Sequence, residues 1–230
     1  RARGITVCNI PAYSTERVAH TAIMMILNLS SSMQIQQAML ARGDRSNFTK
    51  CMQVSHVEVN GKVLGVVGAG TIGREVIKVA QALGMKVLAY TRTPRADEDN
   101  LKYVSLEELL KQSDYISLHC PLTPQTRHMI NKETIAMMKP TAYIINTGRG
   151  ALIDEPALIE ALKEGRIAGA GLDVQETEPP VQNNPLYDMP NVILTPHMGW
   201  KGLETRQRLV SILAANIQAF DEGRPQNVVS

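Results

Sequence analysis

The stretch VLGVVGAGTIG, residues 63–73, decides the fold of this 230-residue chain. Its apolar first half predicts a buried strand, and the apolar residues that follow recur at helical spacing. In such a turn Gly68 permits the tight bend, Gly70 lets the backbone approach a pyrophosphate, and Gly73 lets the helix pack on the strand. The helix N-terminus attracts the negative charge. A glycine pattern alone can be a simple turn, but the strand before it and the helix after it predict a dinucleotide site.

Strands and helices alternate along the rest of the chain. This alternation predicts an α/β fold of Rossmann type, a doubly wound parallel sheet with helices on both faces. Ligands of such folds bind at the carboxyl ends of the strands. The expected strands cover residues 63–67, 87–90, 115–120, 143–146, 170–174 and 192–195. The expected helices cover residues 72–83, 131–138, 154–164 and 204–222, and a capping-box pattern at 105–108 opens a short one.

The N-terminal part has a different pattern. Residues 5–10 are a short β-branched run, stopped by Pro11, that predicts a strand. Apolar residues then recur at spacings of three and four, which predicts one long helix over residues 15–42. Its methionine-rich stripe indicates core or a subunit interface rather than a cofactor site. The polar residues 44–55 are typical of a loop.

Composition and charge narrow the class of protein. With 44% apolar residues the chain can form a real core, and its formal net charge of +2 comes without a run of five or more like charges. We therefore expect no nucleic-acid or membrane partner. The most apolar stretch, residues 22–29, is too short to cross a bilayer. Cys8, Cys51 and Cys120 are odd in number and form no CxxC, which argues against disulfides and a zinc site and favours a reducing cytoplasm.

The end of the second expected strand bears on the choice of cofactor. Thr91 stands 18 residues beyond Gly73, where an NAD site usually has a carboxylate for the ribose hydroxyls, and Arg92 follows it. A guanidinium could hold a 2′-phosphate that no carboxylate repels, so the sequence favours NADPH over NADH. The alternative is that Arg92 is a solvated charge that stacks on adenine, which is compatible with NADH.

Three charged residues follow later strands. Arg149, Glu178 and His197 could supply a carboxylate anchor, a tuning acid and a proton donor for reducing a 2-keto acid. A guanidinium can stabilise the charge that hydride transfer leaves on the keto oxygen, and an imidazolium can protonate it. A carboxylate beside the histidine favours its charged form. Each residue alone could instead be structural: a loop salt bridge, a turn glutamate or a structural histidine.

Five motifs resemble the NAD-binding region of the D-isomer-specific 2-hydroxyacid dehydrogenases, and the resemblance extends over essentially the whole chain. The motifs are GAGTIG, SLHCPLTPQTRHMIN, INTGRGALIDEPAL, GAGLDVQETEPP and TPHMGW. The resemblance implies that Arg149 binds the substrate carboxylate and carbonyl, that His197 is the acid-base group, and that Glu178 is its partner. It places Asp173 near the nicotinamide carboxamide, although a purely structural role for Asp173 stays open. His119 and His128 are expected to be structural. The implied cofactor site comprises Gly68, Gly70, Thr71, Ile72, Gly73, Thr91, Arg92, Cys120, Pro121, Thr126, Thr147, Gly148, Arg149, Asp173, His197 and Gly199.

Within that family, Trp200 and the GLETRQRL that follows are similar to the glycerate dehydrogenase or hydroxypyruvate reductase branch. An indole could shape a pocket for hydroxypyruvate or glyoxylate, or Trp200 could be core or interface. A glutamate rather than a glutamine at Glu178 disfavours formate dehydrogenase-like chemistry.

The resemblance also implies a domain division. Residues 13–196 would form the dinucleotide-binding domain, and residues 1–12 and 197–230 would be remnants of a second, substrate domain at both termini. Because the chain begins Arg-Ala-Arg, we expect a fragment or processed product that binds cofactor better than it catalyses.

Residues 15–42 resemble the family's dimer-forming segment, so we expect a homodimer. Two rival interpretations are a corepressor-like protein that senses the cofactor, which the near-neutral charge disfavours, and a cofactor-binding remnant without activity.

Overall fold

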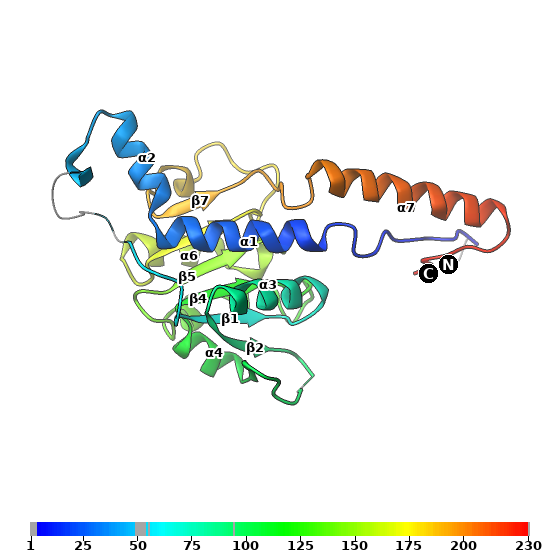
Figure 1. Cartoon of the computed structure of the whole chain (residues 1–230), viewed down its shortest axis with the longest axis horizontal. Helices are drawn as coiled ribbons and strands as arrows, with labels where there is room; N and C mark the ends of the chain where they lie inside the picture. Colours follow the sequence, from blue (N-terminus) through cyan, green and yellow to red (C-terminus); the bar gives the residue numbers. More distant parts are fainter. Residues whose placement is uncertain (1–3, 49–53, 55, 94, 230) are drawn as a thin grey trace.

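A computed structural model describes residues 4–48, 54, 56–93 and 95–229. Its centre is a seven-stranded sheet in the order β3-β2-β1-β4-β5-β6-β7 (Figure 1). All six strand pairs are parallel. The strands are β1 Val63–Val67, β2 Lys86–Tyr90, β3 Leu101–Tyr103, β4 Tyr115–Leu118, β5 Tyr143–Asn146, β6 Gly169–Leu172 and β7 Val192–Leu194. The predicted doubly wound sheet is therefore confirmed, with its switch point between β1 and β4.

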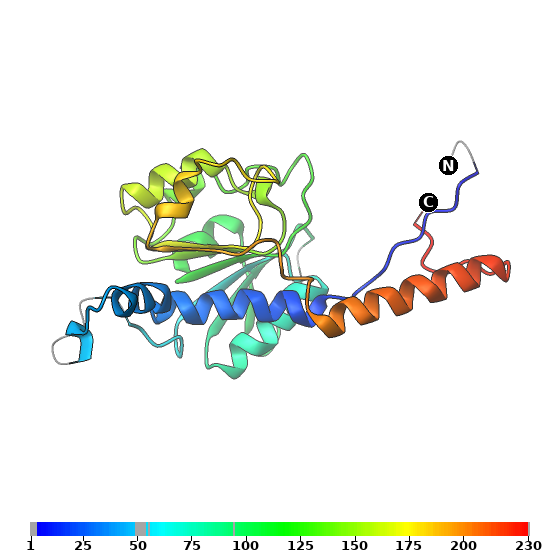
Figure 2. The ribbon, with the colours of Figure 1, turned by 90° about the horizontal axis from the view of Figure 1, so that it is seen from above.

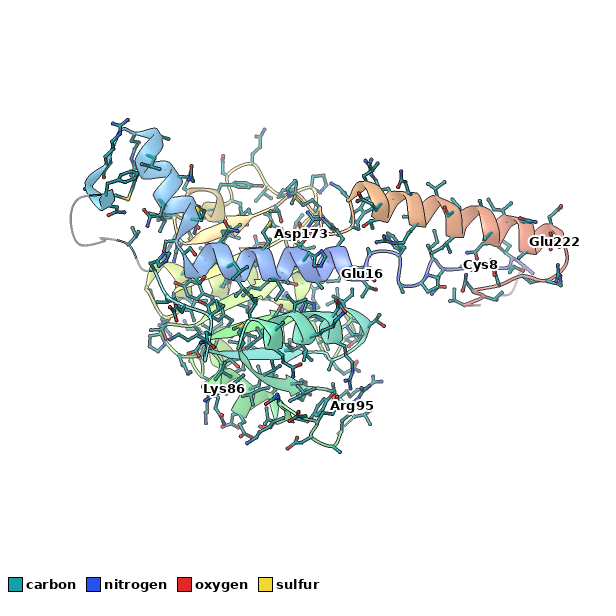
Figure 3. All side chains as sticks on the ribbon, viewed as in Figure 1. Cys8, Glu16, Lys86, Arg95, Asp173 and Glu222 are labelled. Atoms are coloured by element: carbon teal, nitrogen blue, oxygen red, sulfur yellow. The ribbon has the colours of Figure 1, made fainter. Side chains whose placement is uncertain are left out.

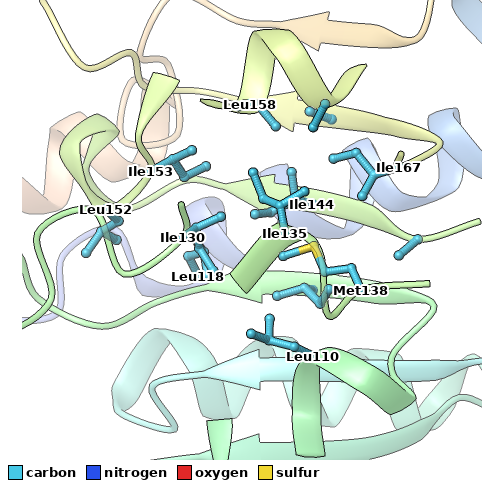
Figure 4. Close-up of a cluster of buried hydrophobic side chains, with 14 of the residues drawn as sticks. Leu110, Leu118, Ile130, Ile135, Met138, Ile144, Leu152, Ile153, Leu158 and Ile167 are labelled. Atoms are coloured by element: carbon cyan, nitrogen blue, oxygen red, sulfur yellow. The ribbon is translucent and has the colours of Figure 1, made fainter. Parts of the chain in front are cut away.

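Helices cover both faces of the sheet. They are α1 Thr15–Ser30, α2 Met33–Ala41, α3 Thr71–Ala82, α4 Leu106–Gln112, α5 Lys132–Ile135, α6 Glu155–Lys163 and α7 Leu203–Asp221. The buried side chains of α1 and α3 pack against one face of the sheet. Those of α4, α5 and α6 pack against the other face, in the cluster drawn in Figure 4. The two apolar clusters sandwich the strands, so the strand ends are left as the accessible edges.

The strand predicted over residues 5–10 is wrong. The described part of this segment makes only an isolated bridge between Cys8 and Val228, supported by bonds from Asn9 N to Asn227 O and from Val229 N to Val7 O. A β-branched run forms a strand only where a neighbouring segment pairs with it at several residues, and here the pairing is limited to these contacts. The two ends of the chain run side by side along the outer half of α7, away from the sheet (Figures 1 and 2).

The single helix predicted over residues 15–42 is also wrong, because the chain breaks between α1 and α2. Ser32 lies in the left-handed region with φ 47°. The Ser30 hydroxyl donates to the carbonyl of Leu27 at 2.8 Å. Serine side chains compete for backbone hydrogen bonds in this way, and here the competition overrides an apolar spacing that continues through the break.

Smaller differences concern short elements. The helix expected over residues 131–138 is only α5, which begins at a capping box of Asn131 and Thr134 and is followed by a turn. The loop expected over residues 44–55 contains the 3₁₀ turn η1, Ser46–Phe48, and residues 49–53 and 55 lie outside the described residues. Within the described ranges, no helix is both long enough and apolar enough to span a membrane.

Candidate active site

The glycine turn between β1 and α3 has the shape that a phosphate group needs. Gly68 has φ +100°, and a Cβ there would lie 2.6 Å from the backbone nitrogen of Cys120. A Cβ on Gly73 would overlap the carbonyl oxygen of Gly68. At Gly70, by contrast, a Cβ would meet nothing within 4 Å, so this backbone is open to a ligand. Gly70 is the N-cap of α3, whose N-terminal amides point toward that space.

Two cavities meet at this edge of the sheet and share Cys120 and Pro121. The first, of about 670 Å³, lies over the turn and the end of β2. It is lined by the predicted residues Gly68, Gly70, Thr91, Arg92 and Thr126, and by Arg95, which was not predicted. The second, of about 450 Å³, lies over the ends of β4, β5 and β6. It is lined by Ile72, Thr147, Gly148, Arg149, Asp173, His197, Gly199 and Trp200. The nucleotide half of a dinucleotide cofactor would fit the first cavity, and its reacting half would fit the second.

Three predicted residues line neither cavity. Thr71 is the first residue of α3, and Gly73 is buried against Gly68. Glu178 lines a separate hollow beside the second cavity and reaches it through His197. Thr126 lines the first cavity but also stabilises its own loop, where its hydroxyl donates to the carbonyl of Pro121 at 2.7 Å.

The loop that carries Arg149 is held from inside the protein. The fully buried Asn146, at the end of β5, donates from Nδ2 to the carbonyl of Arg149 at 2.9 Å and accepts from Gly148 N at 3.0 Å. The exposed Arg149 guanidinium donates to the carbonyl of Gly148 at 2.8 Å. Among the described residues no carboxylate pairs with Arg149, so this geometry does not support the salt-bridge alternative.

His197 and Glu178 form a direct pair. Nδ1 of His197 lies 2.8 Å from Oε2 of Glu178, and both side chains are 38% exposed. The other carboxylate oxygen, Oε1, accepts from the backbone nitrogen of Gln175 at 3.2 Å. Because Nδ1 is engaged, Nε2 is the imidazole nitrogen left to exchange a proton with a ligand in the cavity.

Asp173, at the end of β6 (Figure 3), is 1% exposed and holds the loop that carries His197. Its Oδ1 accepts from Thr195 Oγ1 at 2.5 Å and from Met198 N at 2.8 Å, and its Oδ2 accepts from Gly199 N at 2.8 Å. A Cβ on Gly199 would lie 2.9 Å from that Oδ2, so glycine keeps the loop close to the carboxylate. These contacts support the structural alternative for Asp173, although the residue also lines the cavity.

His128 has the structural surroundings that the sequence favoured, whereas His119 also lines the second cavity, beside Cys120 and Pro121. Burial lowers the pKa of His119 to about 4, so its imidazole is neutral near pH 7. Its Nε2 lies 2.8 Å from the hydroxyl of the buried Ser117. His128 Nε2 lies 2.6 Å from Oε1 of Glu176 and away from both cavities.

Sequence reasoning missed residues that come from the start of α1. Tyr13, Ser14 and Val18 line the second cavity beside His197. Tyr13 and Ser14 directly precede α1 and Val18 lies on its buried face, and only tertiary packing brings them to the strand ends. Asn146 was also missed, although an asparagine at the end of an apolar strand, just before Thr-Gly-Arg-Gly, is a usable signal for a buried loop anchor.

The site has an unsatisfied polar atom where a cofactor would lie. Thr147 is 8% exposed, and its Oγ1 has no hydrogen-bond partner within the part of the chain that the structure describes. Buried hydroxyls are normally paired, so a ligand with a polar group in the second cavity would satisfy it. Together with the open backbone at Gly70, this fits a nicotinamide dinucleotide that runs from the first cavity into the second.

Fold and site together define an NAD(P)-dependent oxidoreductase. Residues 23–199 match the family model described as the D-isomer specific 2-hydroxyacid dehydrogenase, NAD binding domain. The chain belongs to this family, and it acts on small 2-hydroxy or 2-keto acids by hydride transfer.

Individual relatives agree with this assignment. The chain is 44% identical to a hydroxypyruvate reductase of Blautia hydrogenotrophica, over 99% of this chain and 72% of the relative. It is 42% identical to a glycerate dehydrogenase of Methylorubrum extorquens, over 100% of this chain and 73% of the relative. Among solved structures, an acyclic imino acid reductase in complex with NADPH and D-Arg has a TM-score of 0.90 and 33% identity, over 100% of this chain and 72% of that one.

Proposed function

We propose that this enzyme reduces hydroxypyruvate or glyoxylate, to D-glycerate or glycolate, with Arg149, His197 and Glu178 as its catalytic group. One observation carries the proposal: the His197–Glu178 pair and Arg149 come from three separate strand ends and meet at one cavity. The names of the two relatives above support these substrates. Trp200 in the cavity wall supports a small substrate, because its ring occupies space that a larger side chain of the acid would need.

The three residues have complementary tasks. When bound, the reduced nicotinamide supplies a hydride to the keto carbon of the substrate. Arg149 binds the substrate carboxylate and stabilises the negative charge that develops on the keto oxygen. His197 donates the proton from Nε2 that turns this oxygen into a hydroxyl. Glu178, through its bond to Nδ1, holds the imidazole in place and sets a negative charge beside it.

The cofactor would be held by the residues around the two cavities. The amides at Gly70 and the start of α3 would take the pyrophosphate. Thr91 and Arg92 would lie at the adenosine ribose, and Thr147, Gly148 and Asp173 would lie at the nicotinamide end. Arg92 and Arg95 both line the first cavity, and two guanidinium groups without a carboxylate favour NADPH.

Replacing Arg92 by alanine tests the cofactor preference. Loss of a charged hydrogen bond to a 2′-phosphate costs about 1.5–3 kcal/mol, so the KM for NADPH should rise by roughly 10- to 100-fold. The KM for NADH should change by less than about twofold, because NADH has no such phosphate. Arg166→Ala is the matched control, since Arg166 pairs with Glu164 and lines neither cavity. An intact enzyme that prefers NADH, with an NADPH KM unchanged in Arg92→Ala, would contradict the preference.

Replacing Glu178 by glutamine tests the tuning role. Glutamine can still accept a hydrogen bond but carries no charge, so the imidazolium that donates the proton loses its counter-charge. We expect kcat to fall roughly tenfold or more near neutral pH and the optimum to move to lower pH. The measurement is kcat against pH for both proteins. An unchanged pH profile would count against this role for Glu178.

We also propose the domain division and the homodimer implied by the sequence. Residues 7–9 and 227–229 contact each other, and Asn216 of α7 donates to the carbonyl of Asn9 at 2.9 Å, which supports one unit formed by residues 1–12 and 197–230. Exposed apolar side chains on α2 and η1 support a subunit contact there: Met33 is 43%, Leu40 is 40% and Phe48 is 73% exposed. The molecular mass in solution tests the dimer.

The function itself is tested by assaying the intact enzyme with hydroxypyruvate, glyoxylate, pyruvate and phosphohydroxypyruvate, each with NADH and NADPH. The proposal predicts the highest kcat/KM for hydroxypyruvate or glyoxylate. A higher kcat/KM for pyruvate or phosphohydroxypyruvate would contradict the proposed substrate. Cofactor binding without turnover of any of the four would favour a cofactor-sensing or inactive protein instead.

A further inference from the structure

Glu176 stands two residues before Glu178 and brings separate segments together through its carboxylate. Its Oε1 lies 2.6 Å from Nε2 of His128 and accepts from the Arg127 guanidinium at 3.3 Å. Its Oε2 accepts from the backbone nitrogen of Glu155, the first residue of α6, at 3.3 Å. The side chain is only 21% exposed, so these bonds are partly shielded from water.

The contact with α6 is reciprocal. The backbone nitrogen of Glu176 donates to Oε2 of Glu155 at 3.2 Å. The other oxygen of Glu155 accepts from Nδ2 of the buried Asn184 at 2.7 Å, and the same Nδ2 lies 3.2 Å from Oε1 of Gln175. The Glu176 carboxylate also lies at the positive N-terminal end of α6, which favours its charge. The segment 173–178 is thus fixed to the start of a helix.

The same cluster contacts the loop that carries Arg149. The backbone nitrogen of His128 donates to the carbonyl of Ala151 at 2.9 Å, while its imidazole contacts Glu176. Gly150 lies so close to the carbonyl of Gln175 that a Cβ there would overlap it. His128 therefore joins the loop of Arg149, by its backbone, to the segment of Glu178, by its side chain.

We propose that Glu176 is a positioning residue that fixes the segment carrying Glu178 in register with the loop carrying Arg149. Glu176 lines neither of the two cavities, so it acts through other residues and touches no ligand. This inference rests on the proposed roles of Glu178 and His197. It assigns a positioning role to Glu176, a residue that has no part in the proposed reaction itself.

The effect should appear at the His197–Glu178 pair. Glu178 Oε1 is bonded to Gln175 N, inside the segment that Glu176 anchors, and Oε2 is bonded to His197. Catalytic groups work only when they are held within about 0.5 Å of their productive position. Without Glu176 the Glu178 carboxylate should leave His197 for part of the time. The Arg149 loop keeps its bonds to Asn146, so binding of substrate should change less than turnover.

A double-mutant cycle in the intact enzyme tests the proposal. We expect Glu176→Ala to lower kcat by up to about tenfold, and by no more than Glu178→Gln lowers it because Glu176 acts through Glu178, with the KM for the keto acid and the cofactor within about threefold. Glu176→Gln, which can still accept from Glu155 N, should recover part of that loss. In the Glu178→Gln background, Glu176→Ala should lower kcat by less than about twofold, because residues that act through one another are not additive.

The dependence of kcat on pH is a second measurement, and a general loosening of the fold would not shift its optimum. The charged or titratable residues that contact His197 or share the second cavity with it are Glu178, Asp173, Arg149, His119, Cys120 and Tyr13. Since only the Glu178 contact is weakened, Glu176→Ala should move the pH optimum in the same direction as Glu178→Gln, by a smaller amount. Glu160→Ala is the control, since Glu160 also lies on α6 and pairs with Lys132 at 3.1 Å, away from both cavities.

The possible outcomes are distinguishable. If Glu178→Gln leaves kcat and pH profile unchanged, the proposed function fails and not merely this inference. If Glu178→Gln has its effect but Glu176→Ala has none, or if the two effects multiply in the double variant, the positioning role is overturned. If Glu176→Ala does not fold, the same cycle run with Glu176→Gln decides, with non-additivity supporting the role and additivity refuting it.

Discussion

Replacing His197 with alanine is expected to lower kcat for keto-acid reduction by about 10²- to 10⁴-fold, the range for loss of a positioned proton donor. The reason is the geometry of its loop. Nδ1 is engaged by Glu178 at 2.8 Å, and Asp173 holds the loop on both sides of His197 through the Thr195 hydroxyl and the backbone nitrogens of Met198 and Gly199. Nε2 is therefore presented to the cavity, and alanine leaves no group there that can supply the proton.

The control for His197→Ala separates chemistry from binding. The glycine turn and the first cavity contain no atom of His197, so the dissociation constant of the reduced cofactor should change by less than about threefold. His20→Ala, at an exposed histidine of α1, should keep full activity. More than a tenth of normal kcat in His197→Ala, or a loss of turnover explained by lost cofactor affinity, would contradict the assigned role.

Replacing Arg149 with glutamine is expected to lower kcat/KM for the keto acid by about 10²- to 10³-fold, the cost of removing one donor aimed at a developing oxyanion. Unlike the loss of His197, it should also raise the KM for the keto acid, because the guanidinium binds the carboxylate of the substrate before the reaction. No carboxylate in the described part of the chain competes for this guanidinium.

Arg149→Lys sharpens this prediction. Lysine keeps the charge but not the planar fork that binds a carboxylate through two bonds, so its kcat/KM should lie between those of the glutamine variant and the natural protein. Since Asn146 bonds only backbone atoms of the loop, neither variant should unfold it, and the melting temperature should stay within a few degrees. Equal loss in the lysine and glutamine variants would show that the fork is essential, and no loss in either would contradict the role of Arg149.

Much of the fold could be predicted because it rests on local patterns. The apolar run before Gly68 and the helical spacing after it describe β1, α3 and the turn between them without further information. The same holds for β5 and α6, whose N-cap Asp154 accepts from Ala157 N. Since parallel strands all point the same way, residues after separate strands had to meet at one edge, and this placed Arg149 and His197 on one cavity.

The errors come from interactions that no local pattern contains. The apolar spacing of residues 15–42 continues through Ser30 and Ser32, so only the hydrogen bond of the Ser30 hydroxyl and the left-handed backbone of Ser32 reveal the break. Tyr13 lines the reacting cavity only because α1 packs across the sheet. Glu176 is a charged residue in a loop, with no periodic signal, and its partners lie 21 and 48 residues away. Such contacts follow from the packed loops and cannot be deduced from spacing.

The most direct test of the central claim is to follow the label when the intact enzyme reduces hydroxypyruvate with a cofactor dideuterated at C4 of the nicotinamide. If hydride passes directly to the keto carbon in this site, the glycerate will carry one deuterium at C2 and have the D configuration. Glycerate without deuterium at C2, or with the L configuration, would contradict the account.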